Sequence, residues 1–261
     1  MMTVIVPTDF SSTANNAALY AARMLTGNYE VQLLLFTVYE KANEAESTEQ
    51  SLSELKASLA EQSIVKIESK TEQSGDFIET LDRLARHTDA QLVVMGLSSK
   101  SKLGQMFFGS NTLKMVQKNA CPVMIIPPDA QYTEIKNAAL TSDFKDVQKS
   151  TPIVPIKNVL NFFRPALHIV NVDSDHYVSL TDEYLLQRAY LQDSFKEFNP
   201  EFYFIRMFDV HDTIQQFVQD KKIDVLVTIP RSHSLFSNLF VTSTTKKLVY
   251  ESAVPILAAH E

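Results

Sequence analysis

The sequence predicts two doubly wound α/β domains in tandem, each with a five-stranded parallel sheet and helices on both faces. Two observations support this fold class. Apolar runs of strand length alternate with helical stretches along the chain, an order typical of right-handed parallel crossovers. Landmarks of the first half also return in the second half at an offset of about 133 residues. With 261 residues, the chain has room for two ordinary domains.

The clearest landmark of the repeat is the first strand. Residues 4–10 (VIVPTDF) return at 138–144 (AALTSDF) as an apolar run that ends in a hydroxyl residue followed by Asp-Phe. The fourth strand and the start of the last strand keep the same offset. We therefore expect domains at residues 1–129 and 134–261, joined near Pro128–Thr133.

In the first domain, near-continuous apolar runs such as residues 31–36 (VQLLLF) suit strands that are covered on both faces. The first helix is expected after the N-cap residues Ser11-Ser12-Thr13 and to end at Gly27. Residues 40–51 are polar and mostly acidic, so we expect a solvated segment there, before a short helix. The expected strands are residues 3–7, 31–38, 64–69, 91–96 and 122–127.

In the second domain the same order is expected, with a disturbed first helix. Pro152 and Pro155 remove backbone donors and push the preceding residues out of the helical region. The helix is therefore expected to start late, near Pro155. The expected strands are residues 135–140, 166–172, 201–206, 223–229 and 254–259.

Composition narrows the range of functions. A hydrophobic content of 45% with 21% charged residues fits a globular protein with buried cores. The net charge of −7 disfavours binding to nucleic acid, because the phosphate backbone would be repelled. No apolar run approaches the roughly 20 residues needed to span a bilayer, and the N-terminus opens into a strand pattern instead of a signal peptide. We expect no membrane association and a cytoplasmic location.

Residues 92–127 carry the most functional information, because they read as strand, long polar loop, helix start, helix and strand. This order places the N–H groups of a helix beyond the carboxyl end of a buried strand, where phosphate is well bound. Gly96 leaves no side chain where the loop begins, and Gly109 lets the backbone approach a phosphate. Ser110 adds a hydroxyl at the helix start.

The spacing Gly96, two residues, Ser99, nine residues, Gly109-Ser110 resembles the nucleotide loop of the universal stress protein family, which runs Gly, two, Gly, nine, Gly-Ser/Thr. Residues 4–11 (VIVPTDFS) are similar to that family's opening strand and turn, and residues 120–123 (ACPV) to the start of its last strand. The resemblance covers the first half of the chain.

The resemblance implies flavodoxin-like, Rossmann-like domains of the adenine nucleotide alpha hydrolase type. It also implies an adenine-nucleotide site in the first domain, for ATP, with magnesium if it is bound. By family analogy, Asp9 and Val38 would face ribose and adenine. The residues implied for the site are Pro7, Thr8, Asp9, Val38, Met95, Gly96, Ser99, Gly109, Ser110 and Asn111.

One departure from the family pattern bears on this site. Ser99 stands where ATP-binding members carry a glycine, and if that position needs positive φ, a Cβ costs on the order of 1 kcal/mol or more. Lys100 and Lys102 either compensate by pairing with phosphates or are ordinary charges of a solvated loop. The alternative interpretation is that Gly109-Ser110 is only a loop and helix cap, and that Asp9 caps the following helix.

The second domain lacks the nucleotide signal. Its equivalent stretches, residues 228–234 and 241–243, contain no glycine, so we interpret this domain as a degenerate copy. Arg231 and His233 in that region either bind a small anion or belong to a plain polar loop.

Catalytic and metal motifs are not found. The chain has no Gly-x-Ser-x-Gly elbow, Walker loop or His-Glu-x-x-His helix, and Asp173-Ser174-Asp175-His176 is interpreted as a turn. The single cysteine, Cys121, is interpreted as a small core residue. We expect the protein to have no enzymatic activity and no metal site. Slow ATP hydrolysis would need a general base and metal ligands, which we do not identify in the sequence.

The resemblance also implies pairing of domains through their last strands, here residues 122–127 and 254–259, in an internal pseudo-dimer or a homo-oligomer. Aromatic residues near both loop regions, at 106–108 and 235–240, either pack as core or form a partner patch. The predicted function is ligand-dependent or stress-linked regulation through association. The alternative is a structural or protein-interaction module that has lost nucleotide binding in both domains.

Overall fold

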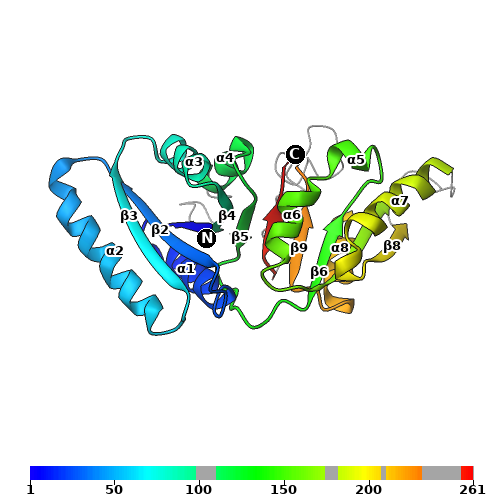
Figure 1. Cartoon of the computed structure of the whole chain (residues 1–261), viewed down its shortest axis with the longest axis horizontal. Coiled ribbons are helices and arrows are strands. Elements are labelled where there is room, and N and C mark those ends of the chain that lie inside the picture. The colour runs from blue at the N-terminus through cyan, green and yellow to red at the C-terminus, as the bar shows by residue number, and fades with distance from the viewer. Residues whose placement is uncertain (98–109, 174–181, 207–209, 231–253, 261) are drawn as a thin grey trace. The chain divides into compact units, whose positions relative to one another are not determined.

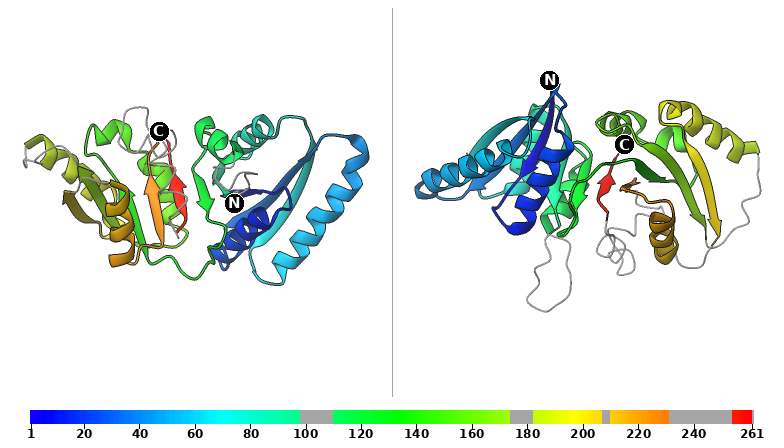
Figure 2. Two further views of the ribbon diagram at one scale, coloured as in Figure 1. Left: turned by 180° about the vertical axis from the view of Figure 1, so that it is seen from behind. Right: turned by 90° about the horizontal axis from the view of Figure 1, so that it is seen from below.

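A computed structural model describes residues 1–97, 110–173, 182–206, 210–230 and 254–260. The chain divides into two compact units, Met1–Thr133 and Glu134–Glu261, which are described separately below (Figures 1 and 2).

The first domain is a doubly wound α/β domain with the strand order β3-β2-β1-β4-β5, and its strands pair in parallel. Helices α1 and α2 lie together on one face of the sheet and α3 and α4 on the other (Figure 1). From β1 the chain adds β2 and β3 on one side and then β4 and β5 on the other, so the strand order reverses between β1 and β4. This is the usual place for a ligand in such sheets. The elements are β1 (Met2–Pro7), α1 (Ser12–Met24), β2 (Val31–Tyr39), the 3₁₀ turn η1 (Ala42–Glu44), α2 (Ala45–Ala60), β3 (Lys66–Gln73), α3 (Phe77–His87), β4 (Ala90–Gly96), α4 (Ser110–Lys118) and β5 (Val123–Ile126).

Helix α1 begins and ends close to the predicted residues. Ser11 is the N-cap, and its hydroxyl accepts a hydrogen bond from the Ala14 N–H at 3.3 Å. Gly27, with a φ of 85°, turns the chain after the helix. The buried face of α1 is made largely of alanine, including Ala17, Ala18, Ala21 and Ala22. These small side chains let α1 approach the sheet closely, which matters for the site described below.

None of residues 40–51 is buried, as expected for a solvated segment, but the segment is largely helical and α2 is longer than the short helix expected. A carboxylate oxygen of Glu44 accepts hydrogen bonds from the N–H groups of Glu40 and Lys41, both at 3.2 Å, and helix α2 follows directly. Only Leu52 and Leu59 of α2 are buried. A long helix with such a narrow apolar stripe keeps a polar sequence, so its composition gives little sign of the helix.

The second domain repeats the topology, with the strand order β10-β9-β6-β7-β8 and parallel pairing. Both halves of the chain therefore have the predicted fold class. The elements are β6 (Asn137–Thr141), α5 (Val147–Ser150), α6 (Ile153–Leu160), β7 (Ala166–Asp173), α7 (Asp182–Ser194), η2 (Lys196–Phe198), β8 (Glu201–Arg206), α8 (Val210–Asp220), β9 (Val225–Thr228) and β10 (Ile256–Ala258).

The first helix of this domain is broken, as the two prolines predict. A single turn, α5, ends before Pro152, and α6 begins at Ile153. Pro155 lies in the first turn of α6, where its missing N–H would have had no partner within the helix. The helix thus starts two residues before the predicted position.

A polar cluster surrounds the buried His168 of β7. Its Nδ1 lies 3.3 Å from the Tyr203 hydroxyl, and its Nε2 lies 3.4 Å from the Asn137 side-chain oxygen. The Glu201 carboxylate is 3.9 Å from Nδ1. Burial lowers the pKa of His168; Lys221 acts in the same direction and Glu201 opposes it.

This pKa shift predicts that acid weakens the second domain. The unfolded chain takes up a proton near pH 6.5 while the folded domain resists it, so the contribution of His168 is present above about pH 6.5 and is lost as the pH falls through its folded pKa. Denaturant titrations between pH 7.5 and 5 should show a smaller loss for His168→Gln than for the wild type. His87→Gln, at an exposed position of the first domain, is the control. Equal pH dependence of the wild type and His168→Gln would contradict the assignment.

Candidate functional site

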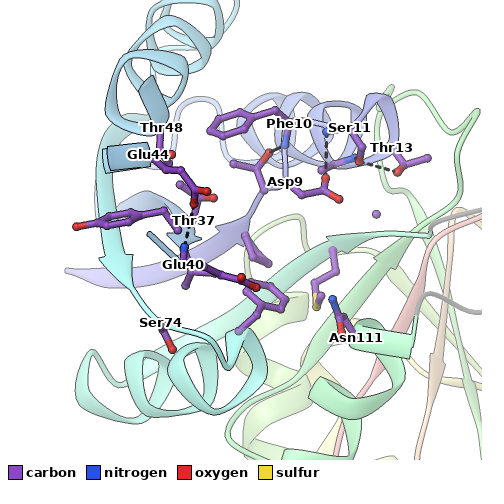
Figure 3. Close-up of a pocket in the computed structure, with 18 of the residues that line it drawn as sticks. Asp9, Phe10, Ser11, Thr13, Thr37, Glu40, Glu44, Thr48, Ser74 and Asn111 are labelled. Atoms are coloured by element: carbon purple, nitrogen blue, oxygen red, sulfur yellow. Dashed lines mark hydrogen bonds between the residues drawn. The ribbon is translucent and has the colours of Figure 1, made fainter. Parts of the chain in front are cut away.

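A pocket of about 920 Å³ opens at the carboxyl ends of β1, β2 and β4, where the strand order of the first sheet reverses (Figure 3). Residues 7–11 form one side of it, together with the first turn of α1. The end of β2 and the beginning of α2 form the opposite side. The turn before α3, the end of β4 and the first turn of α4 complete the lining.

The structure brings together most of the residues that the sequence analysis assigned to a site. Ser99 and Gly109 lie outside the described residues, as do Lys100 and Lys102. Ser110 begins α4, and its side chain is outside the description. The assigned residues that line the pocket are Pro7, Thr8, Asp9, Val38, Met95, Gly96 and Asn111.

A tight turn after β1 presents Asp9 to the pocket. The Thr8 hydroxyl accepts from the Phe10 N–H at 2.9 Å, and an Asp9 carboxylate oxygen accepts from the Ser11 N–H at 3.0 Å. Phe10 has a φ of 62°, in the left-handed region. Asp9 therefore braces the turn, while the N-cap of α1 is Ser11. The exposed Asp9 carboxylate keeps further acceptor capacity, so bracing the turn and contacting a ligand are compatible roles.

Gly96 is required by packing of β4 against α1. A Cβ at this position would lie 2.3 Å from the carbonyl oxygen of Thr13 and 2.7 Å from its carbonyl carbon. The Thr112 hydroxyl donates to the Gly96 carbonyl at 3.4 Å, which ties the start of α4 to the same point. The sequence analysis assigned Gly96 to the site because of the loop that follows it. In the structure, the reason for a glycine here is the close approach of Thr13, which is distant in the sequence.

Sequence reasoning missed one wall of the pocket. This wall comes from the segment that was expected to be solvated, and from the turn before α3. Only the capping pattern of Glu44 three residues after Lys41 could have signalled an ordered helix start here. The missed lining residues from these two segments are Glu40, Glu44, Ser47, Thr48, Ser74, Gly75 and Phe77.

The pocket is acidic. Asp9, Glu40 and Glu44 line it, and no lysine or arginine is found among its described lining residues. Within the described part of the chain, no group of three or more His, Cys, Asp or Glu residues is arranged to hold a metal ion. Elsewhere in this domain, burial raises the pKa of the Cys121 thiol to about 12, so the thiol is protonated at neutral pH and is a poor nucleophile.

The corresponding turn of the second domain has the same hydrogen bonds but a different environment. The Ser142 hydroxyl accepts from the Phe144 N–H at 3.2 Å, and an Asp143 carboxylate oxygen accepts from the Lys145 N–H at 3.1 Å. Phe144, however, is 6% exposed, whereas Phe10 is half-buried and lines the pocket. In this domain the turn places Phe144 in an aromatic cluster.

That cluster consists of the buried Phe144 and Tyr184, the half-buried Phe202 and the exposed Phe204. The ring centroids of Phe144 lie 5.1 Å from Tyr184 and 5.2 Å from Phe204, and those of Tyr184 and Phe204 are 5.1 Å apart. These separations are typical of favourable aromatic pairs. Arg231, His233 and the aromatic residues at 106–108 and 235–240 lie outside the described residues.

Comparisons with known proteins agree with this fold. The sequence profile of the universal stress protein family matches residues 1–127. The structure of a universal stress protein from Archaeoglobus fulgidus DSM 4304 aligns with a TM-score of 0.72 and 16% identity, covering 99% of this chain and 98% of that one. A putative universal stress protein from Pseudomonas aeruginosa UCBPP-PA14 aligns with a TM-score of 0.66 and 13% identity, covering 100% and 93%.

No curated protein matches the chain. Among the described residues, none of the helices has both the length and the apolar character needed to cross a membrane.

Proposed function

Because residues 1–127 belong to the universal stress protein family, and the second domain fits a tandem arrangement of the same fold, we propose a regulatory protein that binds an adenine nucleotide in its first domain. It acts in the cytoplasm through association and not through turnover of a metabolite. The observation that carries this proposal is the convergence of Asp9, Val38, Gly96 and Asn111 on one pocket at the strand-order reversal.

The pocket supports nucleotide binding by its size and position. Its volume of about 920 Å³ falls within the usual range of ligand sites. The first turns of α1 and α4 both line it, and helix N-termini favour anionic groups such as phosphate. ATP, with magnesium if it is bound, is the ligand class that the family implies. Association through β5 and β10, within one chain or between chains, is the mode of action that we propose.

A structural or interaction module without nucleotide binding is the second candidate. Two observations favour it. Ser99 replaces a glycine of the family's nucleotide loop. The pocket also carries three carboxylates but no basic group among its described lining residues. Calorimetry with nucleotides decides between the two candidates.

The deciding variant is Asn111→Trp. Asn111 is exposed in the first turn of α4 and faces the pocket (Figure 3), so an indole there should occupy the opening at little cost in folding. We expect an adenine nucleotide to bind the wild type in the micromolar range, about −8 kcal/mol, and to bind Asn111→Trp at least about tenfold more weakly. Isothermal titration calorimetry checks this result.

Gln117→Trp is the matched control, because Gln117 is exposed on the same helix but does not line the pocket. It should bind like the wild type. If adenosine, AMP, cyclic AMP and ATP all give no binding heat with the wild type, and no shift in its thermal unfolding, the nucleotide proposal fails and the interaction module stands.

A further inference from the structure

The charges around the pocket restrict the kind of nucleotide that it can accept. Three carboxylates, those of Asp9, Glu40 and Glu44, line the pocket, and its described lining residues include no lysine or arginine. A cleft lined by charges of one sign focuses the field between its low-dielectric walls. These carboxylates oppose negative charge on a ligand, against the helix N-termini of α1 and α4 that favour it, and their opposition grows with each phosphate.

The three carboxylates are not equivalent. Glu44 uses a carboxylate oxygen to hold the N–H groups of Glu40 and Lys41, so it is part of the start of α2. Asp9 braces the turn after β1 through the Ser11 N–H. Both acids thus have a structural role, and removing either one would disturb the walls of the pocket.

Glu40 differs because, among the described residues, only its backbone makes hydrogen bonds. Its N–H donates to Glu44, and its carbonyl accepts from the Gln73 side chain at 3.1 Å. Its carboxylate receives no hydrogen bond from another described residue, and in Figure 3 it extends into the pocket. It lies directly after β2, two residues beyond Val38. The Glu40 carboxylate can therefore accept hydrogen bonds from a ligand and repel the ligand's anionic groups.

We propose that the pocket selects an adenine ligand of low negative charge, a nucleoside or a singly charged cyclic mononucleotide, over a nucleoside triphosphate. Glu40 is the residue that imposes this selection. The inference rests on the proposed adenine site and specifies its ligand class. A nucleoside keeps the amine and hydroxyl donors that a carboxylate can accept, and it lacks the polyphosphate that the three acids oppose.

The test compares adenosine, cyclic AMP and ATP by titration calorimetry, at about 50 mM salt so that screening is weak. ATP is measured with and without magnesium. The wild type should bind adenosine at least about tenfold more tightly than ATP. In Glu40→Gln this ratio should narrow by about three- to tenfold, chiefly through tighter binding of ATP. Raising the salt to about 0.5 M should narrow the ratio in the wild type as well.

Glu46→Gln is the matched control. Glu46 lies on α2, is exposed and does not line the pocket, so the substitution makes the same change in net charge. It should leave the adenosine-to-ATP ratio within about twofold of the wild type. Tighter binding of ATP than of adenosine by the wild type, or an unchanged ratio in Glu40→Gln, would overturn the charge selection while leaving the adenine site intact. No binding of any adenine compound would refute the site itself.

Discussion

Substituting Gly96 by alanine should lower the free energy of unfolding of the first domain by about 3 kcal/mol, near the upper end of overpacking costs. The new Cβ would lie 2.3 Å from the Thr13 carbonyl oxygen. The backbone fixes the positions of both atoms. No side-chain rotation can relieve it, so either α1 or the end of β4 must move. Both elements carry lining residues of the pocket, so ligand binding should weaken together with stability.

Gly75→Ala is the control for this prediction. Gly75 lies on the same pocket, but a Cβ there would meet no atom within 4 Å, so its substitution should be neutral or slightly stabilising. Because two domains unfold in one chain, hydrogen–deuterium exchange of amides in β1 and β4 is the appropriate measurement. Similar protection in the two variants would show that α1 yields easily and that Gly96 is not needed for packing.

Substituting Phe144 by alanine should destabilise the second domain by about 3–5 kcal/mol, as expected for loss of a buried aromatic side chain. Phe144 is 6% exposed and packs against Tyr184, Phe202 and Phe204. Phe144→Leu should recover part of the loss, because leucine refills some of the cavity but not the aromatic contacts. Amide exchange in β6 and β7 measures the effect.

Phe10→Ala, at the equivalent position of the first domain, is the matched comparison. Phe10 also has a positive φ, 62° against 52° for Phe144, so any relief of backbone strain is similar in the two variants. Because Phe10 is half-buried at the edge of a pocket, its truncation should cost only about 1 kcal/mol. Equal losses at the two positions would contradict the view that this turn faces a pocket in one domain and a packed core in the other.

The tandem repeat, the fold class and most strand positions were predictable from the sequence, because they depend on local patterns. A buried parallel strand reads as an apolar run, and Asp9 and Asp143 mark the same turn in each copy because its hydrogen bonds span only two residues. The convergence of Asp9 and Val38 also followed from topology, since the carboxyl ends of parallel strands share one edge, whereas Asn111 comes from the first turn of α4 and was implied by the family resemblance.

The tertiary structure alone decided the features that arise between residues far apart in the chain. The approach of Gly96 to Thr13, and the packing of Phe144 on Phe204, join segments whose separation leaves no periodic signal. The acidic wall with Glu40 was hidden for a different reason: α2, which follows it, buries so few residues that its sequence reads as a solvated segment. Local pattern therefore determined the fold class and the turns at the strand ends, whereas long-range packing determined which side chains meet and which charges line the pocket.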